Sequence, residues 1–232
     1  MREIVFDTET TGLNPAGGDR VVEIGCVEIY NRIETGRHFH AYFNPERDMP
    51  FEAQEVHGLT NLFLSDKPRF AERVEELLDF LEDSPLVAHN ASFDFGFLNF
   101  ELERCGRPSL SMSRMVDTLA MARTRHPGAK HSLDALCVRF GIDRSQRVKH
   151  GALLDAQLLA QVYVELTGGR QIGLGLVADT RRLDASAGPG TVKVREPRAA
   201  RPHEALAGEL ERHRAFIEKL VNPLWARFAE AG

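Results

Sequence analysis

Cysteine, tryptophan and long apolar runs are all scarce in this chain of 232 residues. The three cysteines, Cys26, Cys105 and Cys137, are scattered and odd in number, which fits neither a disulfide framework nor a zinc site. No apolar run approaches the roughly 18 residues that a membrane helix needs. The first residues also lack the apolar region of an export signal. These absences predict a protein of the reducing cytoplasm with no membrane partner.

Basic residues are in the minority, with 29 Lys and Arg against 34 Asp and Glu and a net charge of −5. This balance argues against binding a polyanion through basic side chains alone, although an acidic site can bind one when cations neutralise it. Residues 178–202 are rich in Ala, Arg, Gly and Pro and poor in large apolar residues. Such a composition cannot bury a core, so this stretch is predicted to be a flexible linker.

Apolar patterning predicts an α/β fold, with a mixed sheet flanked by helices. Three strands come first in close succession, as expected for an antiparallel meander, and strands then alternate with helices. Strands are expected at residues 4–6, 21–30, 33–43 and 86–88, and residues 115–123 are predicted as a short strand or helix. Helices are expected at residues 51–58, 68–81, 92–104, 132–140 and 152–166, with Ser92 and Ser132 capping the third and fourth.

Two acids, Asp7 and Glu9, follow the first apolar run. Because alternate strand residues point the same way, their side chains are expected on one face. Two carboxylates held side by side repel, and a fold tolerates this when a cation lies between them. Hard oxygen ligands of this kind suit Mg²⁺ or Mn²⁺. The alternative is that both acids simply begin a polar turn at residues 10–12.

Three further candidates are Asp94, His150 and Asp155. Asp94 falls in the first turn of a helix, where the helix dipole favours an anion. Positions five apart on a helix differ by about 140°, so His150 and Asp155 converge only if His150 precedes the helix. Gly151 favours that break. A lone Asp in the first turn of a helix is more often a capping residue than a metal ligand, and a lone histidine is more often structural than catalytic. All of these residues in this order are much less frequent by chance.

The ordered set resembles a known family. Asp-Thr-Glu-Thr-Thr-Gly at 7–12, His-Asn-Ala-Ser-Phe-Asp at 89–94 and His-x-x-x-x-Asp at 150–155 are similar to the three motifs of DEDDh 3′→5′ exonucleases. Val-His-Gly-Leu-Thr at 56–60, Asp-Lys-Pro at 66–68 and Leu-Thr-Gly-Gly at 166–169 resemble the epsilon proofreading subunits of bacterial DNA polymerase III. The resemblance spans about residues 3–167 and implies a ribonuclease H-like fold, with an exonuclease domain at residues 1–169.

The resemblance also implies a role for each candidate residue. Asp7, Glu9 and Asp155 would ligate one divalent metal ion, Mg²⁺ or Mn²⁺. Asp7 would also touch a second ion, which Asp94 would hold. His150 would accept a proton from the attacking water as a general base.

A second set of residues is expected to contact the substrate. Glu52 and His57 match family positions that contact the terminal nucleotide, alongside the carboxylates of the first metal ion. Leu13 and Phe93 are expected to pack against the frayed bases, since stacking does not depend on base sequence. Ordinary core packing is the alternative for these two residues.

The C-terminal part carries two further expectations. Residues 170–177 contain Gln171, Leu174 and Leu176, which resemble the short peptide by which replication proteins bind the sliding clamp. The alternative is an apolar start to the linker. Residues 203–232 are predicted as an amphipathic helical tail that either folds back or docks on another subunit. In the resembled family the tail binds the polymerase alpha subunit. Its apolar stripe consists of Leu206, Leu210, His213, Ile217, Leu220, Val221, Leu224, Trp225 and Phe228.

The sequence therefore predicts a proofreading subunit that removes nucleotides from a single-stranded or frayed primer 3′ end as 5′-mononucleotides. One alternative is a stand-alone DEDDh exoribonuclease acting on short RNA or tRNA ends. Those relatives generally lack a clamp peptide and a tethered tail. Another alternative is an interaction subunit whose nuclease site has decayed, and the presence of all five site residues argues against it.

Overall fold

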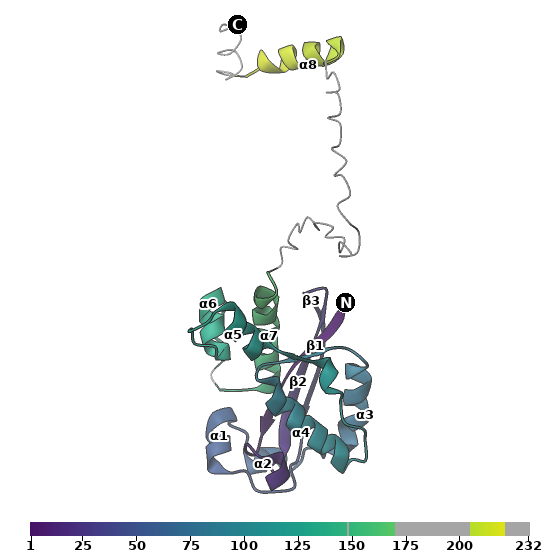
Figure 1. The fold of residues 1–232 in the computed structure, drawn as a ribbon, viewed down its shortest axis with the longest axis vertical. Helices are drawn as coiled ribbons and strands as arrows, with labels where there is room; N and C mark the ends of the chain where they lie inside the picture. The colour runs from purple at the N-terminus through teal and green to yellow at the C-terminus, as the bar shows by residue number, and fades with distance from the viewer. Residues whose placement is uncertain (148, 170–204, 221–232) are drawn as a thin grey trace, which may run out of the picture. The chain divides into compact units, whose positions relative to one another are not determined.

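The computed structural model describes residues 1–147, 149–169 and 205–220. Its centre is a five-stranded sheet in the order β3-β2-β1-β4-β5 (Figure 1). The pairs β1–β2 and β2–β3 are antiparallel, whereas β4 is parallel to β1 and β5 to β4. The predicted mixed sheet and antiparallel meander are confirmed. The strands are β1 (Arg2–Thr10), β2 (Val21–Tyr30), β3 (Ile33–Tyr42), β4 (Leu86–Ala88) and β5 (Met115–Asp117).

Local sequence explains the long β2–β3 hairpin. Asn31 and Arg32 join the two strands and both have positive φ angles, 50° and 67°. Two left-handed residues give a turn whose twist matches that of the flanking strands. Strand β2 is buried from Val21 to Ile29 because layers of helices cover both faces of the sheet. Its near-continuous apolar run follows from that double burial.

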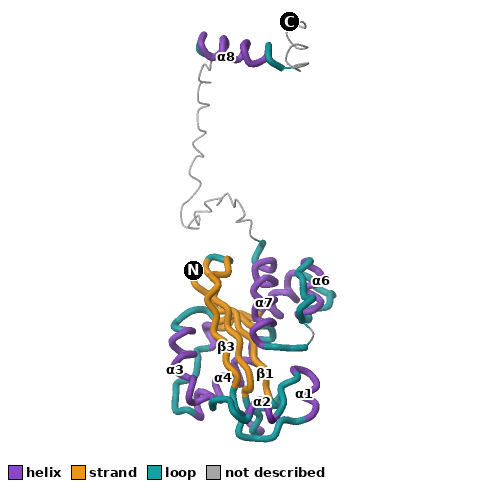
Figure 2. Tube along the Cα trace, turned by 180° about the vertical axis from the view of Figure 1, so that it is seen from behind, coloured by secondary structure: helices purple, strands orange, loops and turns teal. Residues whose placement is uncertain are grey.

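Helices cover the two faces of the sheet, as Figures 1 and 2 show from opposite sides. On one face, α3 (Phe70–Leu81) and α4 (Ala91–Arg104) pack against Ile4 and Phe6 of β1. On the other face, α7 (Ala152–Leu166) packs against Val5 of β1. Helices α5 (Thr118–Arg125) and α6 (Leu133–Phe140) extend the α7 layer. The connections include α1 (Phe51–His57), α2 (Asn61–Leu64) and short 3₁₀ turns at Pro15–Gly17 and Met112–Arg114.

The capping predictions had mixed outcomes. Ser132 caps α6 as predicted, by accepting a hydrogen bond from the Ala135 N–H, and Gly141 ends that helix in the left-handed conformation. Ser92 was wrongly predicted as the cap of α4. The helix begins at Ala91 and Asn90 is the capping position, with φ 63° and ψ 49°. Asparagine tolerates this left-handed geometry better than most residues. The cap lies two residues earlier than predicted.

By its internal contacts the chain divides into two compact units, Met1–Leu176 and Val177–Gly232. In the second unit the structure describes one helix, α8 (Ala207–Ile217), with Leu206, Leu210 and Phe216 exposed. The predicted apolar stripe runs on to Phe228, outside the described residues. Residues 170–204, which include the predicted clamp peptide and linker, and residues 221–232 lie outside the described residues. None of the helices in the described ranges has the length and apolar character to span a membrane.

Candidate active site

The first two acids lie on the face of β1 that α7 covers. Asp7 pairs with Gly25 of β2, and Glu9 pairs with Glu23. A side chain at Gly25 would come within 2.3 Å of the Leu153 backbone in the first turn of α7. Glycine therefore lets this turn lie directly on the sheet beside Asp7. This close approach brings Asp155, which is buried in the first turn of α7, to the acids of β1.

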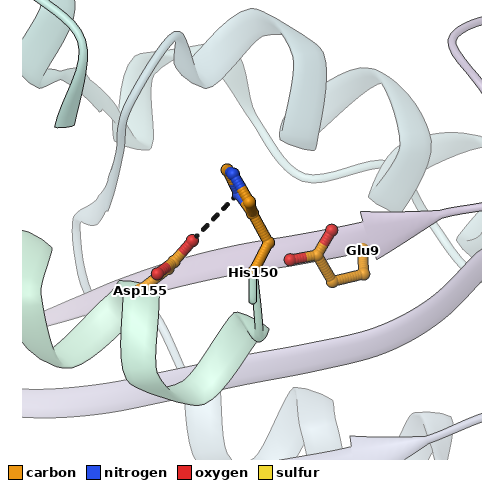
Figure 3. Close-up of side chains that lie close together, drawn as sticks. All are labelled: Glu9, His150 and Asp155. Atoms are coloured by element: carbon orange, nitrogen blue, oxygen red, sulfur yellow. Dashed lines mark ion pairs between the residues drawn. The ribbon is translucent and has the colours of Figure 1, made fainter. Parts of the chain in front are cut away.

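One cavity of about 270 Å³ gathers all five candidates from the three motifs. Figure 3 shows Glu9 on β1, Asp155 on α7 and His150 on the loop that precedes this helix. One ligand atom from each of these three residues lies within 4.8 Å of the other two. His150 Nδ1 is 3.4 Å from Asp155 Oδ2. His150 and Asp155 therefore converge across a break at Gly151, as predicted. The cavity is lined by Asp7, Thr8, Glu9, His89, Phe93, Asp94, Ser132, Leu133, Asp134, Arg147, His150 and Asp155.

Asp94 reaches this cavity from the first turn of α4, as predicted. Its Oδ1 accepts hydrogen bonds from the Thr8 N–H at 3.1 Å and the Thr8 hydroxyl at 2.7 Å. Burial raises the pKa of Asp94 from 3.8 to about 7, and the Thr8 hydrogen bonds oppose that rise. Asp94 is thus fixed to β1, and its pKa lies close to neutral pH, so its charge depends on what else occupies the cavity.

The same buried, acidic environment raises the pKa values of the two β1 acids, Asp7 and Glu9. Burial, and then repulsion from neighbouring carboxylates, raises the pKa of Asp7 well above its ordinary value. Burial and then the carboxylate of Glu23 raise the pKa of Glu9 from 4.5 to about 8. Among the described residues, buried Glu9 Oε1 has no hydrogen-bond partner. A buried oxygen without a hydrogen-bond partner, among carboxylates whose pKa values are raised, fits a hard divalent cation as ligand.

These shifts predict that the metal-free chain loses stability as the pH rises. The folded-state pKa values of Glu9 and Asp94 lie above the ordinary values of 4.5 and 3.8. Between the ordinary and the raised pKa values, Glu9 and Asp94 bind more protons in the folded chain than in the unfolded chain, so their contribution to stability falls with increasing pH up to about pH 8. We expect the melting temperature in chelator to fall across this window, and Mn²⁺ to oppose the fall by favouring the charged carboxylates. A melting temperature in chelator that rises over this window would contradict the electrostatic picture.

Two residues that the sequence reasoning missed complete the cavity. Arg147 donates to Asp155 Oδ1 at 2.5 Å and Oδ2 at 2.7 Å, and to Asp134 Oδ1 at 3.0 Å. Its terminal nitrogen also lies 2.8 Å from His150 Nδ1. A positive charge three positions before His150 was the available signal. Asp134, on the first turn of α6, carries no comparable signal in its sequence context.

A second cleft of about 530 Å³ adjoins the carboxylate cavity and shares Thr8, Glu9 and Phe93 with it. Leu13, Glu52 and His57 line this cleft as well. Leu13 is 83% exposed, so the core-packing alternative for it is wrong. Phe93 is half-buried and contacts Phe97, and it lines both the carboxylate cavity and the second cleft. Leu13, Glu52, His57 and Phe93 therefore line one cleft together with Glu9, whereas Asp7 and Asp155, which were also assigned to the substrate, line the adjoining carboxylate cavity.

His57 sits in the wall of this second cleft. The side chain is buried at the end of α1, and its Nδ1 accepts the Leu59 N–H at 3.0 Å. Burial lowers its pKa, which favours the neutral imidazole with its proton on Nε2. Among the described residues, Nε2 has no hydrogen-bond partner. Glu52, on the same helix, is exposed at the cleft.

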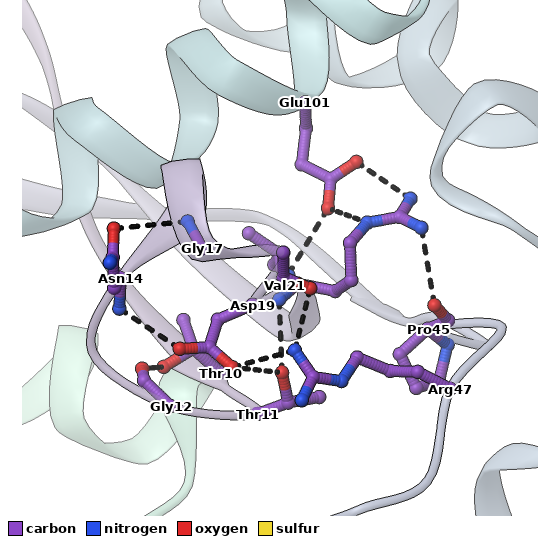
Figure 4. A network of polar contacts seen from close by, with 12 residues as sticks. Thr10, Thr11, Gly12, Asn14, Gly17, Asp19, Val21, Pro45, Arg47 and Glu101 are labelled. Atoms are coloured by element: carbon purple, nitrogen blue, oxygen red, sulfur yellow. Dashed lines mark hydrogen bonds and ion pairs between the residues drawn. The ribbon is translucent and has the colours of Figure 1, made fainter.

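The loop that carries Leu13 is held by a network of polar contacts, shown in Figure 4. Asp19 accepts from the Asn14 N–H at 3.0 Å and from Arg47 at 2.7 Å. Arg20 makes a bidentate, buried pair with Glu101 of α4 at 2.7 and 2.9 Å. A bidentate arginine–carboxylate pair fixes geometry as well as charge. The wall of the cleft is thus tied to α4, the helix that supplies Asp94.

The sheet order, the helices on both faces and the shared cavity define a ribonuclease H-like exonuclease of the DEDDh class. The family model described as RNase_T, Exonuclease, matches residues 4–163. A solved structure of Exonuclease X in complex with 5′ overhanging duplex DNA has a TM-score of 0.54 and 26% identity. That similarity covers 71% of this chain and 90% of the other.

Curated relatives narrow the class further. The DNA polymerase III subunit epsilon of Rickettsia typhi is 46% identical over 224 residues, which is 95% of this chain and 97% of that protein. The subunit of the same name from Escherichia coli is 42% identical over 227 residues, covering 94% and 92%. This chain belongs to the family of DNA polymerase III epsilon subunits.

Proposed function

We propose that this chain hydrolyses the 3′-terminal phosphodiester of a DNA primer and releases 5′-mononucleotides during replication. The observation that carries the proposal is one cavity holding Asp7, Glu9, Asp94, His150 and Asp155 beside an open cleft. The cleft gives a terminal nucleotide room next to the carboxylates. Support for DNA as the substrate comes from the Exonuclease X complex, which contains duplex DNA.

The carboxylates are proposed to hold two divalent ions, Mg²⁺ or Mn²⁺. Asp7, Glu9 and Asp155 would ligate the first ion, and Asp7 and Asp94 the second. Glu9 Oε1, buried and without a partner among the described residues, supports this assignment. At such a site these carboxylates would hold ions that could supply charge stabilisation to the attacking and leaving oxygens of an in-line displacement.

His150 is proposed as the general base. It lies on a loop, with its side chain 48% exposed at the mouth of the cavity, where it can accept a proton from water and pass it to solvent. Its backbone N–H reaches Val56 O of α1 at 3.4 Å, so the loop adjoins the helix that carries His57. Asp155, 3.4 Å from His150 Nδ1, would stabilise the imidazolium that forms.

The second cleft is proposed to bind the terminal nucleotide. Leu13 and Phe93 offer apolar surface for a frayed base, and stacking of this kind accepts any of the four bases. Glu52 at the rim is proposed to accept a hydrogen bond from the sugar. His57, with its Nε2 turned to no described partner, is proposed to donate one. Recognition through sugar and stacking suits an enzyme that must remove whichever base is mispaired.

Two partners are proposed for the C-terminal part. Gln171, Leu174 and Leu176 would bind the sliding clamp, and residues 203–232 would bind the polymerase III alpha subunit. The similarity to the Rickettsia typhi subunit covers 95% of this chain, so it extends over most of the tail as well as the nuclease. The exposed Leu210 and Phe216 of α8 offer apolar surface for a helix-in-groove contact.

A truncation tests this division of labour. The described hydrophobic clusters draw only on residues between Ile4 and Leu166, so a fragment of residues 1–169 should fold alone. We expect the fragment to degrade single-stranded DNA at the rate of the full chain but to fail to co-elute with the alpha subunit. Removal of a mispaired primer terminus should then fall only when polymerase and clamp are present, because tethering raises the local concentration of the nuclease.

The Gln171→Ala variant is the matched control, since it should weaken clamp association and leave alpha binding intact. Persistent one-to-one co-elution of the fragment with alpha would place the main contact on the nuclease domain. The same digestion with an RNA primer of equal sequence addresses the alternative function. A chain that trims RNA faster than DNA would be a stand-alone exoribonuclease.

A further inference from the structure

The side chain of Arg147 lines the carboxylate cavity and contacts Asp155 and His150 there. Although it comes from the loop before α7, its side chain is only 8% exposed. Two of its nitrogens bond the two oxygens of Asp155, at 2.5 and 2.7 Å. Bidentate, charge-assisted pairs of this kind are among the strongest hydrogen bonds in proteins. The guanidinium is therefore held firmly where the carboxylates converge.

The charge of Arg147 acts on more than Asp155. It lowers the pKa of both Asp7 and Glu9, against the larger effects of burial and carboxylate repulsion. The Asp155 hydrogen bonds in turn raise the pKa of Arg147, so the arginine stays charged. Arg147 thus neutralises part of an acidic cluster that would otherwise repel itself.

The same contacts conflict with the proposed chemistry. Asp155 would have to give an oxygen to a divalent ion, and such an ion would lie a few ångströms from the guanidinium and repel it. Arginine has only donors, so its 2.8 Å contact uses the lone pair of His150 Nδ1. In this arrangement Asp155 and His150 are both engaged by Arg147.

Asp134 offers the guanidinium a place to remain when it leaves Asp155. Its Oδ1 accepts from Arg147 at 3.0 Å and from Arg144 at 2.7 Å, and its side chain is 46% exposed. A small rotation about this contact would release Asp155 and His150 without exposing an unpaired arginine. The two arginines share Asp134, but only Arg147 also reaches Asp155 and His150.

We propose that Arg147 is an exchangeable internal cation, which neutralises Asp155 in the metal-free chain and moves to Asp134 when a divalent ion binds. The proposal rests on the proposed metal site at Asp7, Glu9 and Asp155. Metal binding and the release of His150 would then occur together, since the same guanidinium holds Asp155 and His150. A metal-free chain would accordingly be stable and inactive.

The test is calorimetric titration of Mn²⁺ into the full chain at fixed pH and salt. Arg147→Gln removes the competing charge, so its Mn²⁺ affinity should rise by about 5- to 150-fold, the usual range for coupled sites. Arg144→Gln also removes a partner of Asp134 but leaves Arg147 on Asp155 and His150, so its Mn²⁺ affinity should change far less than that of Arg147→Gln. Arg147→Lys should fall between, because an ammonium keeps the charge but cannot bond both oxygens of Asp155.

Thermal unfolding gives a second readout. In chelator, Arg147→Gln should melt below the natural chain, because its buried acids have lost their cation. In saturating Mn²⁺ the two should melt together. Mn²⁺ binding to Arg147→Gln that is equal to or weaker than that of the natural chain would overturn the proposal. Failure of every variant and of the natural chain to bind Mn²⁺ would instead overturn the metal site itself.

Discussion

The Asp7→Ala chain should lose nuclease activity by more than about 10³-fold while remaining folded. Loss of even one preorganised electrostatic contact typically costs about 10²–10³-fold, and Asp7 is proposed to contact both divalent ions. Its carboxylate also faces Glu9, Asp94 and Asp155, each of which raises its pKa. The rate of 3′ digestion of single-stranded DNA in excess Mg²⁺ or Mn²⁺ measures the loss.

The melting temperature in chelator separates a catalytic role from a structural one. Removing one carboxylate from a self-repelling buried cluster relieves repulsion, so metal-free Asp7→Ala should melt at or above the natural chain. Asp155→Ala should lose activity equally but gain no stability, because buried Arg147 loses its bidentate partner and keeps only Asp134. Asp143→Ala, an exposed acid that accepts hydrogen bonds from Ser145, is the control and should change neither quantity. Near-normal activity in Asp7→Ala or Asp155→Ala would refute the proposed metal ligands.

The parts of this molecule that depend on local pattern were predictable from the sequence. Alternation placed Asp7 and Glu9 on one face, and helical spacing placed α7 at Ala152–Leu166. Gly151 marked the break that turns His150 toward Asp155. Each inference uses residues only a few positions apart, where backbone geometry alone decides which way a side chain points.

The parts that depend on contacts between distant segments were not predictable in the same way. Gly25 stands inside an apolar strand, and its reason is the backbone of α7, more than a hundred residues later. The start of α4 moved to Ala91, and the Asn90 at its capping position donates its N–H to Asp117 at the end of β5. Arg147 reaches a buried carboxylate from a surface loop. Charge, size and spacing in the sequence do not specify such pairings.

The His150→Ala chain should lose about 10²–10⁴-fold in rate, the usual contribution of a positioned general base. With the divalent ion saturating, the carboxylates are already charged, so their titration no longer shapes the pH profile. A general base acts in its unprotonated form, so the natural chain should gain activity with increasing pH and the variant should lose this rise. His38→Ala, which removes an exposed histidine of β3, is the matched control and should keep both rate and profile.

Metal affinity decides between the two roles that the geometry allows His150. One nitrogen of His150 lies within 4.8 Å of ligand atoms of Glu9 and Asp155, so a ligand role is geometrically open (Figure 3). A general base contributes nothing to holding the ion, so His150→Ala should bind Mn²⁺ about as tightly as the natural chain. The variant also removes one contact of Arg147, and this should change the Mn²⁺ affinity only slightly. A large loss of Mn²⁺ affinity, on the order of the 10–100-fold seen when metal-supporting groups are removed, would make His150 a ligand. Recovery of the variant's rate by added imidazole, at unchanged Mn²⁺ affinity, would place the missing function in proton transfer, because the unchanged affinity excludes replacement of a metal ligand.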